Sequence, residues 1–517
     1  MSKAHSRLWF TALISLSACS TVPQHTQISL SQPPELTQTS LKARSDSQPK
    51  PESEIKSAPS PVTIRISKPA IISGAGQAVN VTAAVPDQHP VDQPEPPCQV
   101  DLSGGRQLLP QTTVPPLSRI EPPTDNDCGF YNWAWHSFLF STRPDASGQP
   151  AFWGAESLES VFGLSHSQDD SELPLLNAGF RQAGDLAAIL VDQNRRPVFY
   201  SIHINRIFAD FVRSHKLNQV DALLRSEADG GIATDLEFPP GSVEFKAAWR
   251  IVEAGEDTSD YLTLRARVPL LRNQGGKVVA SDKNREVTVA LLSLHVVGVV
   301  VDHPEFIWAT FEHADSRGKL DLGPAALANP VMGQTAQLEA LAPAYPLFEP
   351  GSPVALANRP LDQLIDEASQ TFPAPTPVYR AFPGSLREQS EADSGVDTLN
   401  QAIGELFAKT DPQAKDWRRH YLLVGAVWIN QPGADRPDGD FGADRHFENT
   451  PGHSVLAGED ALSSLAMESF TQDSSNCFSC HNTRAKILSS GQTLPPRRIN
   501  ISNTLTFFAQ AALGRSK

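Results

Sequence analysis

Large aromatic side chains are missing from most of the first quarter of this 517-residue chain. No Phe, Trp or Tyr occurs between Phe10 and Phe130, and the stretch is rich in Pro, Ser, Gln and Thr. Such a segment buries too little apolar surface to offset the conformational entropy that ordering would cost. We therefore expect residues 20–97 to be a disordered tether that precedes the folded part of the chain.

Other absences limit the function. Beyond the N-terminus there is no apolar run of about 18 residues, so the sequence predicts no membrane-spanning helix. No run of Lys or Arg stands out and the net charge is −15, which argues against nucleic acid as a partner. The chain also lacks a GxSxG elbow, an HExxH zinc helix and a second CxxCH, the signatures of serine hydrolases, zinc proteases and di-haem peroxidases.

The first 19 residues have the pattern of a secretory signal peptide. A basic start precedes an apolar run from Leu8 to Leu16, and small residues precede Cys19. The ending LSAC is similar to a bacterial lipobox, which predicts a lipid on Cys19, and Ser20 after it favours the outer membrane. The alternative is an ordinary cleaved signal with an incidental cysteine. Either way we expect export, to the periplasm or as an outer-membrane lipoprotein, with the lipid as the only membrane anchor.

A CxxCH pentapeptide lies near the end of the chain, at Cys477, Cys480 and His481. This order and spacing are those of c-type haem attachment, where two thiols bond to the haem vinyl groups and the histidine is an axial iron ligand. With 5 Cys and 14 His in the chain, chance would produce the pattern about once in a thousand such sequences. The alternatives are a redox CxxC pair or half of a zinc site, which needs two further ligands. We expect one covalent haem c, with His481 as metal ligand.

The two remaining cysteines are Cys98 and Cys128. In an oxidising compartment two leftover thiols at moderate separation are most simply a disulfide. The prediction holds only if their Cα atoms lie within about 7 Å of each other.

The sixth iron ligand decides what such a haem does, because a second strong ligand favours electron transfer and an open position favours chemistry or gas binding. Met467 lies ten residues before Cys477, on a helix predicted over residues 459–472, and is our first candidate. The alternative ligands are His453, His446, His313 and His295. Each of these could equally be an ordinary polar or core histidine without a metal.

The part of the chain after Phe130 predicts an α+β fold with a mostly antiparallel sheet, followed by a helical C-terminal haem c segment. Residues 241–252 alternate apolar and polar side chains, which is typical of a half-buried strand. Further strands are predicted over residues 198–205, 261–268, 287–302, 305–313 and 420–430, and helices over residues 129–140, 206–217 and 397–411. We place an α+β region at 98–395 and the haem region at 396–517, as one large or two smaller domains.

Four segments carry a family resemblance: FPPGSVEFKAAWR, HPEFIWATFEH, YLLVGAVWIN and LAMESFTQDSSNCFSCHN. They resemble an uncharacterised family of bacterial c-type cytochrome proteins, in which a large N-terminal region precedes a single C-terminal CxxCH. The match runs in patches from about Phe130 to His481, and the tail INISNTLTFFAQ departs from it. The resemblance implies haem c bound through Cys477 and Cys480 with His481 as ligand, and it supplies no substrate.

These features predict a lipid-anchored, single-haem c-type cytochrome that transfers electrons to or from a redox partner protein or a small-molecule substrate. One alternative is a haem oxidoreductase or a gas- or peroxide-binding protein with an open iron site. Another is a non-redox surface lipoprotein in which the haem is structural. No catalytic residue is identified, because Glu312 and His313 are adjacent on a predicted strand and should point to opposite faces.

Overall fold

The computed structural model describes most of the chain from Cys128 onward, and all described residues belong to one compact unit. The described ranges are 128–164, 188–316, 357–380, 395–429, 462–472 and 477–515, with shorter pieces that include Cys98. The expected signal peptide, tether and lipidated Cys19 lie outside them, as do Met332, His446 and His453. Among the described helices, none combines the length and the apolar character needed to cross a membrane.

An eight-stranded sheet forms the centre, and all its strand pairings are antiparallel. The strand order is β1-β2-β3-β5-β6-β7-β8, with β4 paired to β5 beside this path. The strands are β1 (Glu156–Ser157), β2 (Phe199–Ile204), β3 (Val243–Ile251), β4 (Thr263–Gln274), β5 (Lys277–Val300), β6 (His303–His313), β7 (Tyr421–Ile429) and β8 (Leu456–Gly458). The sheet and its helices confirm the α+β class.

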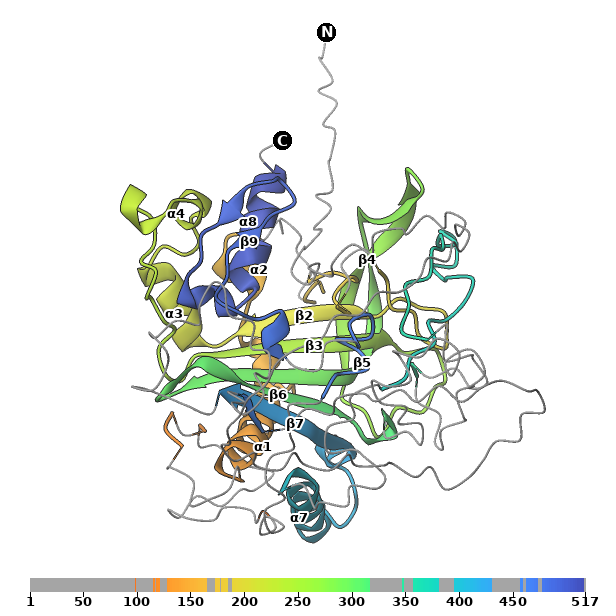
Figure 1. Cartoon of the computed structure of the whole chain (residues 1–517). Helices are drawn as coiled ribbons and strands as arrows, with labels where there is room; N and C mark the ends of the chain where they lie inside the picture. Colours follow the sequence, from red (N-terminus) through yellow and green to blue (C-terminus); the bar gives the residue numbers. More distant parts are fainter. Residues whose placement is uncertain are drawn as a thin grey trace, which may run out of the picture. The chain divides into compact units, whose positions relative to one another are not determined.

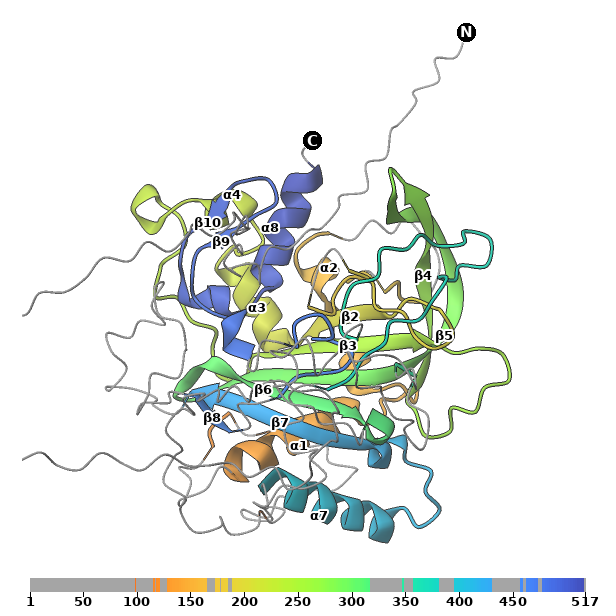
Figure 2. The same cartoon turned by 45° about the vertical axis from the view of Figure 1, so that its right-hand side comes forward.

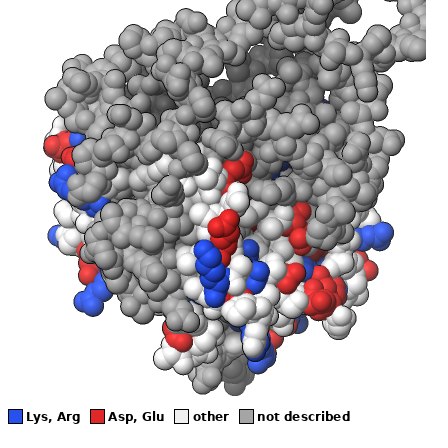
Figure 3. Space-filling model, turned by 90° about the horizontal axis from the view of Figure 1, so that it is seen from below, with Lys and Arg blue, Asp and Glu red and all other residues white. Residues whose placement is uncertain are grey.

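Two helices cover one face of the sheet, α1 (Cys128–Thr142) and α7 (Gly395–Thr410), as Figure 1 shows. The aromatic run in α1 explains its position, because Trp133, Trp135 and Phe138 are all buried in the core that the sheet shares with α7. Both helices confirm the predictions made from these segments. In the space-filling view from this side, acidic and basic side chains of the described residues are intermingled (Figure 3).

The other face is covered by helices and by the end of the chain (Figure 2). The helices are α2 (Leu158–Val161), α3 (Arg206–Ser214), α4 (Val220–Leu224) and α8 (Thr504–Arg515). The prediction that β3 is half-buried was therefore wrong, since its polar side also lies under protein: Glu244 is 8% and Arg250 2% exposed. Alternation separates the two faces of a strand, but it does not say what covers each face.

The C-terminal part of the chain contributes to the same sheet. Strand β7 pairs with β6, so the sheet includes residues from both sides of the expected boundary at 395/396. The helix predicted over residues 459–472 was wrong, because residues 462–472 form turns. Ser464 Oγ accepts hydrogen bonds from the backbone N–H groups of Ala466 and Met467, each at 3.2 Å. Such serine bonds compete with helix formation.

A disulfide joins Cys98 to Cys128 at the start of α1, with the two Cα atoms 5.4 Å apart. This is the pairing that the sequence predicts. Gly395 at the start of α7 packs directly against the bridge, where a Cβ atom would collide with the sulfur of Cys98. The disulfide therefore connects the chain before α1 to both helices of this face.

Candidate functional site

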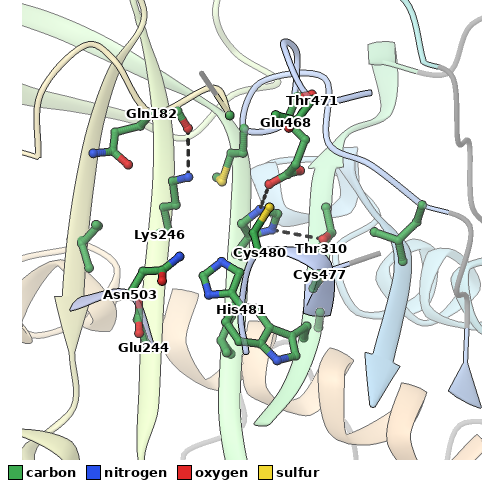
Figure 4. Close-up of a pocket in the computed structure, with 18 of the residues that line it drawn as sticks. Gln182, Glu244, Lys246, Thr310, Glu468, Thr471, Cys477, Cys480, His481 and Asn503 are labelled. Atoms are coloured by element: carbon green, nitrogen blue, oxygen red, sulfur yellow. Dashed lines mark hydrogen bonds and ion pairs between the residues drawn. The ribbon is translucent and has the colours of Figure 1, made fainter. Parts of the chain in front are cut away.

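A cavity lies between the second face of the sheet and the C-terminal segment (Figure 4). The cavity has a volume of about 120 Å³ and is partly open to solvent. Cys477, Cys480 and His481 all line this cavity, so the fold presents the complete CxxCH motif to one enclosed space.

The floor of the cavity comes from neighbouring strands whose side chains form cross-strand rows. The pairing of β3, β5 and β6 aligns one row of Lys246, His295 and Thr310, and a second row of Glu244, Val297 and Trp308. Glu244 and Lys246 were not predicted as residues of the site. Their alternation with apolar residues placed them on one face, but only the covering C-terminal segment makes that face a cavity.

The motif forms a tight turn, η9 (Cys477–Ser479). The backbone carbonyl of Cys477 accepts hydrogen bonds from Cys480 N at 3.2 Å and from His481 N at 2.9 Å. The Lys486 ammonium holds the turn from the other side by donating to Cys480 O at 3.0 Å and to Asn482 Oδ1 at 3.1 Å. Burial lowers the pKa of Lys486 to about 8. Local bonding thus directs both cysteines and the histidine to the same cavity.

His481 is partly buried and has one ring nitrogen free of hydrogen bonds within the described part of the chain. Its Nδ1 donates to the backbone carbonyl of Ile501 at 3.1 Å, which leaves Nε2 with its lone pair. Burial, reinforced by the positive charge of Lys486, lowers the pKa of His481 to about 3, so the imidazole is neutral at physiological pH. The Trp308 ring packs against it with the ring centroids 4.0 Å apart. A neutral, oriented imidazole is the form that binds a metal.

The two cysteines of the motif differ in state. Cys477 is a free thiol, and burial, aided by the negative charge of Glu468, raises its pKa well above the ordinary value. Cys480 is disulfide-bonded in the structure. A thioether at Cys480 therefore requires that this disulfide be reduced first.

Met467 and His295 are the predicted sixth-ligand candidates that reach the cavity. Both ring nitrogens of His295 are engaged, Nδ1 with Thr310 Oγ1 at 3.1 Å and Nε2 with Glu468 Oε1 at 2.9 Å. The side chain of Met467 is buried, and its sulfur makes no hydrogen bond within the described part of the chain. Met467 is therefore the candidate whose donor atom is uncommitted.

His313 does not reach the cavity. It stacks on Tyr261 with ring centroids 3.8 Å apart and pairs with Asp315 at 3.2 Å. Its neighbour Glu312 is fully buried, pairs with Arg380 and accepts a hydrogen bond from Leu465 N at 2.7 Å. Glu312 thus anchors the turn that carries Met467, and the two adjacent residues have separate structural roles.

No family model, curated protein or solved structure matches the chain. Within the described ranges, no three or more His, Cys, Asp or Glu side chains come together as a metal site. His446 and His453, which a zinc site at the CxxCH motif would need, lie outside those ranges. Function must therefore be argued from the chemistry of the cavity.

Proposed function

We propose that this protein is a single-haem c-type cytochrome that transfers electrons. The haem would be bonded to Cys477 and Cys480, with His481 as an axial ligand. The observation that supports this best is that all three motif residues line one cavity. In addition, the Nδ1 of His481 is hydrogen-bonded to the Ile501 carbonyl, which leaves the lone pair of Nε2 for the iron. In this proposal the haem segment runs from the motif to α8, and the chain is exported and lipidated at Cys19.

The residues of the cavity fit a haem. It offers a neutral imidazole, a thioether at Met467, a free thiol at Cys477 and an aromatic wall at Trp308. Once bound, the haem supplies a reversible one-electron change at its iron. The protein's part is to orient His481 through Ile501, to hold the motif turn through Lys486, and to exclude water with Trp308. Met467 as sixth ligand would favour electron transfer over chemistry at an open iron position.

Covalent haem is tested on the full chain produced with a c-type maturation system. We expect a haem-stained band on a denaturing gel and a low-spin absorption spectrum. The double variant Cys477→Ser/Cys480→Ser should lose the covalent haem, because both attachment sulfurs are gone. The matched control, Cys98→Ser/Cys128→Ser, also removes two cysteines and should keep it. Wild-type protein without covalent haem would refute the proposal and favour a redox-thiol function.

The sixth ligand is tested by absorption spectra of the reduced protein with and without carbon monoxide. Wild type should not respond to the gas if Met467 occupies the position, whereas Met467→Ala should bind it. Met332→Ala is the control variant and should behave as wild type. Identical oxidised and reduced spectra for Met467→Ala and wild type would rule out the assignment.

A haem-dependent oxidoreductase is the second candidate function. The specific observation in its favour is that the cavity is partly open to solvent and is lined by the titratable side chains of Glu244, Lys246 and His295. Such a site admits a small molecule, for example peroxide, oxygen or nitric oxide, and offers proton donors and acceptors near it. Uptake of carbon monoxide by the reduced wild-type protein would favour this candidate over the electron carrier.

A further inference from the structure

The side chain of Lys246 lines the cavity, and no carboxylate of the described residues forms an ion pair with it. Its ammonium donates one hydrogen bond, to the backbone carbonyl of Gln182 at 2.9 Å (Figure 4). An ammonium has three donors, and within the described ranges the other two have no hydrogen-bond acceptor and no carboxylate in ion-pair contact. Its ammonium also lies 5.8 Å from the centre of the Tyr200 ring, and the charges of Glu468 and Glu244 act on it through space. Charges inside proteins are normally paired.

The carboxylates around Lys246 are engaged elsewhere. Glu468 accepts from Ser464 N at 2.7 Å through one oxygen and pairs with His295 at 2.9 Å through the other. Glu244 accepts a hydrogen bond from Ser502 Oγ at 2.8 Å. Burial raises the pKa of Glu244 to about 7, so below that pH this carboxyl group is mostly neutral. Burial lowers the pKa of Lys246, while the charges of Glu468 and Glu244 oppose that shift. Neither carboxylate accepts a hydrogen bond from Lys246, so two N–H donors of its ammonium remain for a bound molecule.

Asn503 provides a second unpartnered polar group at the same place. It is only 8% exposed, and its Oδ1 is buried without a hydrogen-bond partner. Figure 4 shows Asn503 beside Lys246 and Glu244 on one side of the cavity, next to His481. The Nδ2 of the same amide donates no hydrogen bond to a described residue, so this N–H donor can serve a ligand. Two independent side chains thus keep N–H donors without an acceptor among the described residues at one end of the cavity.

We propose that Lys246 and Asn503 bind a carboxylate group of the molecule that occupies this cavity. The ammonium supplies the charge and two N–H donors, and the Nδ2 of Asn503 donates a further hydrogen bond. The carboxylate has two possible sources: the haem itself, which carries two carboxylate side chains, or a small free carboxylate that binds beside it. The first source rests on the proposed function above, whereas the second does not.

The test titrates the full-length protein with acetate and succinate at constant ionic strength, by calorimetry and haem absorption, and also measures the reduction potential. Lys246→Met removes the charge but keeps a long side chain, and Lys246→Arg keeps the charge. The control is Lys409→Met, an exposed position on α7 outside the cavity. If the ligand is a free carboxylate, acetate or succinate should bind saturably to wild type. The affinity should fall at least tenfold in Lys246→Met and should be retained in Lys246→Arg and Lys409→Met.

A haem carboxylate as ligand predicts the opposite pattern. Wild type then binds neither acetate nor succinate, but Lys246→Met lowers the reduction potential, because an uncompensated carboxylate stabilises the ferric iron. Lys409→Met leaves the potential unchanged. If Lys246→Met and Lys409→Met agree in both binding and potential, the proposal is overturned. If the wild type carries no covalent haem, the proposed function fails, but calorimetry still tests whether a free carboxylate binds. If acetate and succinate then do not bind, the carboxylate proposal is overturned as well.

Glu244→Gln is a second test variant, and it leaves Lys246 itself unchanged. The other titratable groups that line the cavity are Lys246, His295, Glu468, His481 and the Cys477 thiol. For a free carboxylate, affinity should fall as the pH rises from 6 to 8, because Glu244 ionises and repels the ligand. Glu244→Gln should therefore bind more tightly than wild type at pH 8. Weaker binding by this variant at that pH would contradict the arrangement.

Discussion

His203 illustrates how one buried side chain makes stability depend on pH. Its imidazole lies on β2 against Phe152 and Trp153, and neither ring nitrogen makes a regular hydrogen bond. Burial lowers its pKa from 6.5 to about 4, against a weaker opposing effect of the Ala155 backbone. The folded state therefore resists protonation more than the unfolded state does.

We predict that His203 destabilises the protein as the pH falls. The free energy of unfolding is unaffected by His203 above about pH 6.5. It falls progressively as the pH drops to about 4, where the loss due to His203 reaches about 3 kcal/mol. Asp192, whose pKa burial raises to about 7, acts in the opposite sense over the same range. Because Asp192 contributes equally to both proteins, the measurement compares the free energies of unfolding in urea of wild type and His203→Phe from pH 7 to pH 4. Wild type should lose more stability than the variant, and parallel curves would refute this.

The CxxCH motif is the residue-scale feature most accessible to sequence analysis, because its chemistry depends on residues within a pentapeptide. The groups around it were not predictable. Ile501 orients His481 through its backbone carbonyl, and every residue has such a carbonyl, so the amino-acid sequence does not reveal this contact. Lys246 and Asn503 are 257 positions apart in the sequence, so only the fold brings them to one cavity.

At the scale of elements, α1 packs on β5 through an unusually close approach. Gly298 of β5 lies against the Trp133 ring of α1, and a Cβ atom there would be 2.6 Å from Trp133 Cζ2. Both are enclosed in the core, and the tryptophan belongs to a helix wedged between the sheet and α7. The absent side chain is what allows the helix to lie so near the strand.

We predict that Gly298→Ala destabilises the protein by about 1–3 kcal/mol, because the added methyl group overpacks this contact. The matched control is Gly404→Ala on the exposed side of α7, where a Cβ atom would meet nothing within 4 Å. Alanine favours a helix over glycine, so the control should gain about 0.5–1 kcal/mol. Chemical denaturation of both variants measures the difference. An unchanged midpoint for Gly298→Ala would mean that α1 shifts without cost.

Elements were predicted unevenly, for a physical reason. Helix α7 and strands β6 and β7 have strong periodic or apolar patterns, and the structure confirms them. Residues 462–472 have a helical pattern too, but Ser464 bonds to neighbouring backbone N–H groups and Glu312 captures Leu465 N. A tertiary contact and local side-chain bonds thus outweigh helix propensity there.

At the scale of the whole molecule, the Cys98–Cys128 disulfide closes a loop with a sequence separation of 30 residues. We predict that Cys98→Ser/Cys128→Ser lowers the free energy of unfolding by about 2–4 kcal/mol, mainly because the unfolded chain gains freedom. Denaturation under non-reducing conditions measures this. Equal stability of the double variant and wild type would contradict the prediction.

The sequence by itself determined the local chemistry: the CxxCH motif, the alternation that divides β3 into two faces, and the aromatic run that makes α1 a core helix. These depend on neighbours within a few positions, where spacing fixes geometry. Only the tertiary structure decided that the polar face of β3 is the floor of a cavity, that His481 is oriented by Ile501, and that Lys246 stands there without a carboxylate partner among the described residues. Those facts arise when the end of the chain folds over the sheet, and long-range contacts of this kind leave no periodic signal in a sequence.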